Sequence, residues 1–186
     1  MAEFRLETER LVLRDWREDD WAEFFRVTNT PAVMRWLGGV MDAGGMAAQR
    51  ARVEECRAAH GHCFWVVERR EDQALLGFCG IKRADSPGST IAGLHEIGWR
   101  LREDAWGHGY AKEAAIATID LAFNRFAAPE VFATTVADNT ASWGLMERLG
   151  MRRRPELDYT DIRYGPPWRD AVVYSLSSSE WMARRA

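Results

Sequence analysis

The chain is poor in cysteine and has no long apolar run. No apolar stretch approaches the ~20 residues of a membrane-spanning helix, and the N-terminus carries no signal-peptide core, so we expect a cytoplasmic protein without a membrane partner. Its three cysteines form no Cys-x-x-Cys pair, and their odd number indicates reduced, packed thiols. His60, His62 and Cys63 lack a fourth ligand at a recognisable spacing, so we expect no metal site.

A strong charge of either sign is also absent, because the net charge is only −3 at pH 7. Surfaces that bind nucleic acid usually carry a strongly basic patch, so no nucleic-acid partner is expected. What is present is the composition of an ordinary globular protein, with 47% hydrophobic and 28% charged residues. A chain of 186 residues can bury a sizeable core, and we expect one domain over residues 1–186.

Hydrophobic periodicity and turn residues predict an alternating order of strands and helices. The expected strands are 11–14, 63–68, 75–82, 94–101, 131–136, 152–159 and 171–176, and the expected helices are 19–28, 31–37, 45–59, 110–126 and 139–149. Three consecutive strands on short connections indicate antiparallel pairing, whereas a strand–helix–strand passage indicates a parallel pair. The sequence therefore predicts an α/β (mixed α+β) fold whose mixed sheet has helices on both faces.

The most informative segment is Trp106-Gly107-His108-Gly109-Tyr110-Ala111, which separates an apolar strand from an alanine-rich helix. Two glycines one residue apart let the backbone approach a ligand closely. The N-terminus of the following helix offers unpaired N–H groups and the positive end of the helix dipole. The segment is therefore typical of a site for a phosphorylated ligand.

Two better-known phosphate motifs do not match this loop. No Gly-Lys-Ser/Thr follows it, as a P-loop would require. Gly107 and Gly109 fill two positions of a dinucleotide fingerprint, but Lys112 stands where its third Gly or Ala belongs. Binding of a nucleotide, or a plain tight turn before a helix, stays open as an alternative.

Several motifs in one order make the chain resemble the GNAT family of acyl-CoA-dependent N-acetyltransferases. In the family's pyrophosphate loop Gly109 and Ala111 occupy the last two motif positions, and Trp106 stands where most members have Arg or Gln. The Trp-Gly-x-Gly-Tyr-Ala form is similar to the RimJ/RimL branch, whose members acetylate N-termini of ribosomal proteins. The other matching segments are 8–14, 96–101, 139–151 and 169–174.

The resemblance implies a single GNAT-like domain with a mixed, mostly antiparallel sheet of about seven strands. Strands four and five of that sheet are expected to splay apart, which leaves backbone groups unpaired for the pantetheine of acetyl-CoA, the implied co-substrate. The implied cofactor-binding residues are Trp99, Arg100 and Leu101 on the strand, Trp106, Gly107, His108, Gly109, Tyr110, Ala111 and Lys112 at the loop, and Asn139 and Ser142 on the opposite wall.

The resemblance further implies transfer of an acetyl group to a primary amine by direct attack on the thioester. The acceptor is expected to be a protein N-terminus or a small amine, and a homodimer is expected from relatives. Many members use a tyrosine as proton donor where this chain has Met146. That departure keeps a second hypothesis open, a non-catalytic acyl-CoA-binding module that regulates a partner.

Acetyl transfer requires a neutral amine, and three residues are candidates for the general base. Glu96 begins the matching strand motif and is the first candidate. His95 is its competitor, because an ordinary histidine pKa of about 6.5 suits the task. Adjacent strand residues point to opposite faces, so only one of these two can face the acceptor. Asp161, in the loop between the last two strands, is the third candidate.

The remaining candidates concern the leaving thiolate and the acceptor. Ser142 is expected to donate a hydrogen bond or proton to the coenzyme A sulfur, since Asn139 lies on the same helical face three residues earlier. Met34, Trp36 and Tyr164 are expected to form the wall of the acceptor pocket.

Overall fold

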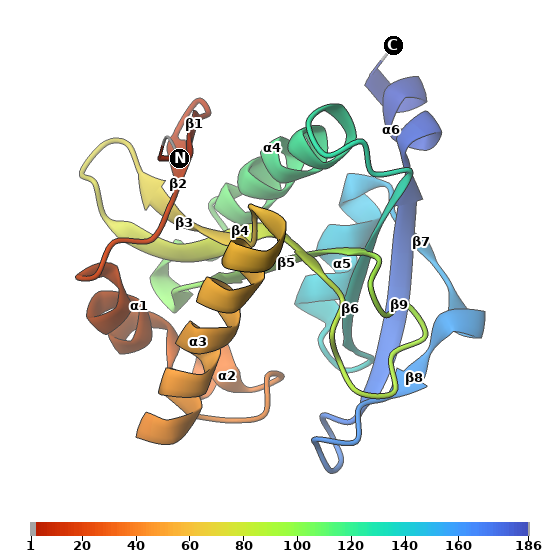
Figure 1. The fold of residues 1–186 in the computed structure, drawn as a ribbon, viewed down its shortest axis with the longest axis horizontal. Coiled ribbons are helices and arrows are strands. Elements are labelled where there is room, and N and C mark those ends of the chain that lie inside the picture. The colour runs from red at the N-terminus through yellow and green to blue at the C-terminus, as the bar shows by residue number, and fades with distance from the viewer. Residues whose placement is uncertain (1–2, 186) are drawn as a thin grey trace.

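A computed structural model describes residues 3–185, so residues 1, 2 and 186 of the expected domain lie outside the described part. Nine strands form one sheet in the order β1-β2-β3-β4-β5-β6-β9-β7, and β8 pairs with β9 (Figure 1). The strands are β1 (Arg5–Glu7), β2 (Leu11–Arg14), β3 (Phe64–Arg69), β4 (Leu75–Arg83), β5 (His95–Leu101), β6 (Glu130–Val136), β7 (Arg152–Arg153), β8 (Tyr159–Thr160) and β9 (Asp170–Ser177).

Six α-helices connect or cover these strands in the described part of the chain. They are α1 (Asp20–Thr28), α2 (Pro31–Met34), α3 (Ala43–His60), α4 (Tyr110–Asn124), α5 (Thr140–Leu149) and α6 (Ser178–Arg185). Local signals explain several boundaries. The side chain of Asp42 caps α3 by accepting from the Gly45 N–H, and Gly61 ends the helix in the left-handed region at φ +73°.

The mixed, mostly antiparallel sheet with helices on both faces is confirmed, but three expectations on its elements are wrong. The expected strand 152–159 is split into β7, a 3-10 turn over Pro155–Leu157, and β8. Together with the short β1, this split raises the strand count from about seven to nine. The expected helix 31–37 ends at Met34. Helix α6 was not expected, because its largest apolar residue, Trp181, is buried by a tertiary contact with α4.

The register between β4 and β5 decides which side chains share a face. Lys82 pairs with Glu96, and Phe78 pairs with Arg100. Phe78 packs with Phe24 of α1 and Val53 of α3. Since side chains alternate along a strand, Glu96 and Arg100 point to this α1/α3 face of the sheet, which α3 crosses in Figure 1.

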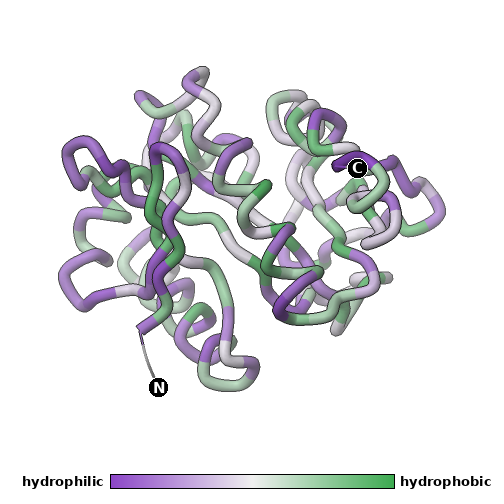
Figure 2. Tube along the Cα trace, turned by 90° about the horizontal axis from the view of Figure 1, so that it is seen from above, coloured by the Kyte–Doolittle hydropathy of each residue, from purple (hydrophilic) through white to green (hydrophobic). Residues whose placement is uncertain are grey.

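The opposite face is packed against α4. Cys79 and Ile81 of β4 lie in one apolar cluster with Ala115 and Ile119 of α4. Figure 2 shows this pattern as hydrophobic stretches in the interior and hydrophilic ones at the periphery. Within residues 3–185, no helix is both long and apolar enough to cross a membrane.

Strands β5 and β6 form the one parallel pair among the described strands, and they pair at a single position, Glu96 with Phe132. By contrast, every residue of β5 pairs with β4, and every residue of β6 pairs with β9. The sheet therefore opens beyond Glu96, between its β1–β5 half and its β6–β9 half (Figure 1). The expected splay between the two central strands is confirmed.

Candidate functional site

Two glycines in the left-handed backbone region precede the N-terminus of α4. Gly107 has φ +76° and Gly109, the residue that caps the helix, has φ +81°. No side chain caps this helix, and its first internal bond runs from the Glu113 N–H to the Gly109 carbonyl at 3.1 Å. The preceding N–H groups, including those of Tyr110 and Lys112, therefore have no acceptor within the helix, and together they form an anion-binding terminus.

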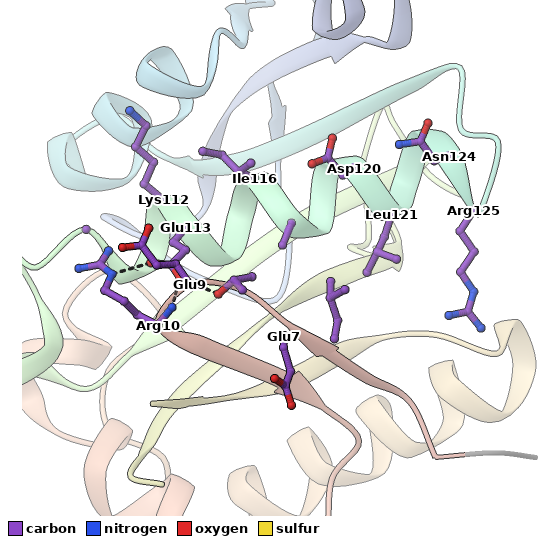
Figure 3. A pocket seen from close by; sticks show the side chains of 14 residues that line it. Glu7, Glu9, Arg10, Lys112, Glu113, Ile116, Asp120, Leu121, Asn124 and Arg125 are labelled. Atoms are coloured by element: carbon purple, nitrogen blue, oxygen red, sulfur yellow. Dashed lines mark hydrogen bonds and ion pairs between the residues drawn. The ribbon is translucent and has the colours of Figure 1, made fainter. Parts of the chain in front are cut away.

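A charged contact from the β1–β2 turn fixes this terminus. Arg10 Nε donates to Glu113 Oε2 at 2.7 Å, and Arg10 Nη1 donates to the His108 carbonyl at 2.9 Å. Thr8 Oγ1 donates to Glu113 Oε1 at 2.6 Å. Figure 3 shows Arg10 and Glu113 at one end of a groove of about 710 Å³ between α4 and the β1–β2 segment. That groove shares only Gly109 and Lys112 with the predicted site residues.

The free edge of β5 provides the second part of the site. The Arg102 N–H donates to the Leu76 carbonyl on the β4 side, so by alternation Trp99 and Leu101 direct their backbone groups toward β6. The Leu101 carbonyl accepts from Trp106 Nε1 at 2.9 Å. Trp106 thus satisfies one edge carbonyl and ties the glycine loop to the strand, a role that sequence reasoning missed.

The start of α5 follows β6, the strand across the opening from this edge. Asn139 is the residue before the helix, and its side-chain amide donates to Thr135 Oγ1 of β6 at 2.9 Å. Ser142 lies half-buried in the first turn. Met146 is fully buried in the core that α5 shares with α4, so its thioether contributes packing and no proton.

Glu96 is buried at the closed end of the opening between β5 and β6. Its Oε1 accepts from Thr134 Oγ1 at 2.9 Å, and its Oε2 lies 3.1 Å from Lys82 Nζ. Apart from that ion pair, Oε2 has no hydrogen-bond partner among the described residues. Burial lowers the pKa of Lys82, but attraction to Glu96 and Asp85 outweighs burial and raises this pKa above its ordinary value. Thr134 and Lys82 therefore contact both carboxylate oxygens of Glu96, one through a hydrogen bond and the other through an ion pair.

His95, the neighbour of Glu96, points to the other face of the sheet. Its ring lies 6.1 Å from that of His62, which in turn stacks on Phe126 at 4.3 Å. Burial, with smaller contributions from Arg83 and His62, lowers the pKa of His95 to about 4. The two residues are therefore separated by the sheet, as strand alternation requires.

Asp161 is buried in the loop before β9 and is held by Arg163. Arg163 Nη2 lies 2.6 Å from Asp161 Oδ2, and Arg163 Nε donates to Oδ1 at 2.9 Å. These contacts lower the pKa of Asp161 below its ordinary value. A carboxylate that is occupied in this way positions Arg163 and is poorly suited to accept a proton.

A pocket of about 180 Å³ lies on the α1/α3 face, between α3, the β4–β5 sheet and the loop after β8. It is lined by Gln49, Arg52, Val53, Cys56, Cys63, Phe64, Phe78, Lys82, Asp85, Arg100, Arg163 and Tyr164. Tyr164, predicted for the acceptor wall, is one of these lining residues. Met34 is buried and Trp36 lies under Arg35, so neither of these predicted wall residues lines the pocket.

The charged lining of this pocket was missed in the sequence, since its members come from segments far apart along the chain. The one residue that could have pointed to this charged pocket is Lys82, because the chain has only two lysines. No group of three or more His, Cys, Asp and Glu side chains within residues 3–185 is arranged to hold a metal ion.

Residues 10–152 match the family model described as "Acetyltransferase (GNAT) domain". The chain belongs to this family. It is 28% identical over 177 residues to the uncharacterized N-acetyltransferase YnaD of Bacillus subtilis, covering 94% of this chain and 97% of that protein. The crystal structure of an acetyltransferase from Agrobacterium tumefaciens superposes with a TM-score of 0.79 at 24% identity and covers 96% of each chain.

A ribosomal-protein-S5-alanine acetyltransferase from Vibrio fischeri has the same fold, with a TM-score of 0.73 at 18% identity, covering 96% of this chain and 98% of that one. Membership of the GNAT family makes this protein an acetyltransferase, and enzymes of this family use acetyl-CoA as co-substrate. The opening between β5 and β6, the glycine loop and the start of α5 therefore form its candidate active site.

Proposed function

We propose that this protein is an acetyl-CoA-dependent N-acetyltransferase that acetylates a primary amine by direct attack on the thioester. The observation that carries the proposal is the single-position pairing of β5 and β6, next to the uncapped N-terminus of α4. Unpaired main-chain groups at the Trp99 edge suit a ligand with amide groups of its own. The α4 terminus, 11 residues further along the chain, suits its pyrophosphate.

The residues at this opening fit acetyl-CoA, which supplies an activated acetyl thioester when it is bound. The backbone of Trp99 and Leu101 would bond the pantetheine amides, and the N–H groups at Gly109 to Lys112 would hold the phosphates. The Trp99 N–H is suited to donate to the thioester oxygen as negative charge develops there. Ser142, in the first turn of α5, would donate to the sulfur.

Glu96 is the residue that we assign as general base. Its Oε2, which is ion-paired with Lys82 but accepts no hydrogen bond from the described residues, would take the proton from the acceptor ammonium, directly or through a water, and Thr134 holds the carboxylate through Oε1. His95 faces the other side of the sheet, and Asp161 is engaged by Arg163. Both are therefore assigned structural roles.

Two measurements on the purified protein test this proposal. Isothermal titration should show binding of acetyl-CoA, and release of free thiol should depend on an amine from a panel of peptides and small amines. Binding without turnover on any amine would favour the non-catalytic module, which the replacement of a tyrosine by the buried Met146 keeps in consideration. Absence of acetyl-CoA binding would reject both hypotheses. Acetylation of N-terminal peptides in preference to small amines would favour the RimJ/RimL assignment.

A further inference from the structure

We take the pocket of about 180 Å³ on the α1/α3 face as the acceptor pocket, because Lys82, the ion-pair partner of Glu96, lines it. This pocket contains more positive charge than its acidic neighbours neutralise. Four cationic side chains line it: Arg52, Lys82, Arg100 and Arg163. Lys82 is paired with Glu96 and Asp85, and Arg163 is paired with Asp161. For Arg52 and Arg100 no carboxylate lies within ion-pair distance among residues 3–185.

Arg100 is the more constrained of these two arginines. Its guanidinium lies 5.3 Å from the Phe78 ring centre and 5.9 Å from that of Phe24, and Nη1 donates to Gln49 Oε1 at 2.9 Å. Its Nε is buried and has no hydrogen-bond partner among the described residues. Burial lowers the pKa of Arg100 to about 10, and repulsion from Arg52 adds to this effect. A buried guanidinium without a carboxylate is costly, and an anionic ligand would relieve that cost.

The size of the pocket restricts that ligand. A volume of about 180 Å³ is below the roughly 300–1,000 Å³ of pockets that enclose drug-sized ligands. Glu96 and Arg100 lie on the same face of β5, four residues apart, which corresponds to ~13 Å between Cα atoms. Lys82, the ion-pair partner of Glu96, lines the pocket together with Arg100, so a short molecule in it can place an amine on the Glu96 side and an anion at Arg100.

We propose that the acceptor is a small amine that carries a carboxylate, an amino-acid-like molecule, and that Arg100 binds this carboxylate. Arg52, which is exposed at the pocket mouth, attracts the same group on entry. A planar guanidinium matches a carboxylate geometrically, and Gln49 holds it in place. This inference rests on the proposed acetyltransferase function and specifies the substrate class of its acceptor pocket.

Matched acceptors test the inference directly. L-alanine, 3-aminopropanoate, 4-aminobutyrate and 6-aminohexanoate would each be compared with the corresponding carboxamide and with the amine that lacks the carboxylate. The rate of thiol release at saturating acetyl-CoA should give kcat/KM values at least about tenfold higher for one or more carboxylates than for their matched carboxamides.

Variants then connect the preference to Arg100. In Arg100→Met the ratio of carboxylate to carboxamide kcat/KM should fall roughly tenfold to hundredfold, mainly through KM. Arg100→Lys should retain part of the ratio, and Arg52→Met should lower it less. Arg26→Met, on the exposed side of α1, is the matched control and should leave the ratio unchanged.

The outcomes separate the inference from the function on which it rests. Equal turnover of carboxylates and carboxamides by the unaltered protein would overturn the carboxylate inference while supporting the acetyltransferase. A fall in acetyl-CoA affinity in Arg100→Met, measured by titration, would mean that Arg100 binds the donor. That result would also overturn the carboxylate inference. Acetyl-CoA binding without turnover of any amine would reject the proposed function and this inference together.

Discussion

The proposed donor side and the proposed acceptor side of this site are built in different ways. The donor side consists of consecutive backbone, from the β5 edge at Trp99 through Gly107 and Gly109 to the first turn of α4. The acceptor side consists of side chains that α3, β4, β5 and the loop after β8 contribute, such as Gln49, Lys82 and Arg163. One side is local in sequence, whereas the other exists only after the chain has folded.

This difference has a chemical consequence. Backbone N–H groups at a helix terminus recognise a phosphate whatever the side chains are, so many sequences can share one donor. A pocket made of charged side chains changes its preference when a single residue changes. The proposed donor side therefore depends on backbone geometry, and the proposed acceptor side depends on individual side chains of this chain.

The largest expected effect is a loss of acetyl-CoA affinity when the glycine loop of the donor side is altered. Gly109→Glu places a carboxylate at the proposed phosphate site and a side chain at φ +81°, so acetyl-CoA affinity should fall by roughly two orders of magnitude or more. Titration calorimetry measures this. Gly93→Glu introduces the same charge at φ +78° in another loop and should leave the affinity intact. Equal losses in both variants would contradict a phosphate site at Gly109.

A second prediction concerns the acceptor side alone. Glu96→Gln keeps the shape of the side chain but removes the base, so kcat should fall about 100-fold while acetyl-CoA affinity is retained. Steady-state kinetics at saturating acetyl-CoA measures this fall, with the exposed Glu54→Gln as control. A fall of less than twofold would remove Glu96 from the proposed mechanism.

A third prediction concerns Ser142 of α5, which we place near the sulfur, between the donor side and the acceptor side. Ser142→Ala removes the hydroxyl that we place near the sulfur, and kcat should fall roughly tenfold because a hydrogen bond to a charged group is lost. Thr140→Ala, an exposed position on the same helix, should have no effect. If the two variants show the same kcat as the unaltered protein, Ser142 has no role in thiolate departure.

The last prediction concerns folding stability, with no effect expected on turnover, and tests the placement of His95, the neighbour of Glu96. The pKa of His95 is lowered to about 4, so between pH 6.5 and pH 4 only the unfolded chain binds the proton. Stability should therefore fall as the pH drops through this range, with a contribution of about 1.4 kcal/mol per pH unit from this one group. Urea unfolding should show a shallower pH dependence in His95→Gln than in the exposed control His108→Gln. An unchanged slope would contradict a buried neutral His95.

Most of the fold could be predicted because its signals are local. The expected helix 110–126 agrees with α4 to within two residues, and the expected strands 75–82 and 94–101 agree with β4 and β5 to within one residue at each end. The region 152–159 could not be resolved, because Pro155 interrupts it and only pairing with β9 defines β7 and β8. Helix α6 was missed for the same reason, since a contact between Trp181 and Asp120 of α4 helps to anchor it.

The candidate site shows the same division. Strand alternation alone required Glu96 and His95 to face opposite sides, but the register with Lys82 and Phe78 was needed to decide which side each faces. Met34 and Trp36 were expected in the acceptor wall from the resemblance, and the pocket is instead lined by charged residues from α3 and β4. No spacing pattern in the sequence brings Gln49 to Arg100.

The sequence by itself determined the glycine loop, the helix that follows it and the family, because backbone conformation at Gly107 and Gly109 and the periodicity of α4 depend on neighbouring residues only. Tertiary structure decided which residues line the proposed acceptor pocket and give it an excess of positive charge. Coulombic and hydrogen-bonding partners such as Arg100 and Gln49 act through space, over distances that the order of residues along the chain does not encode.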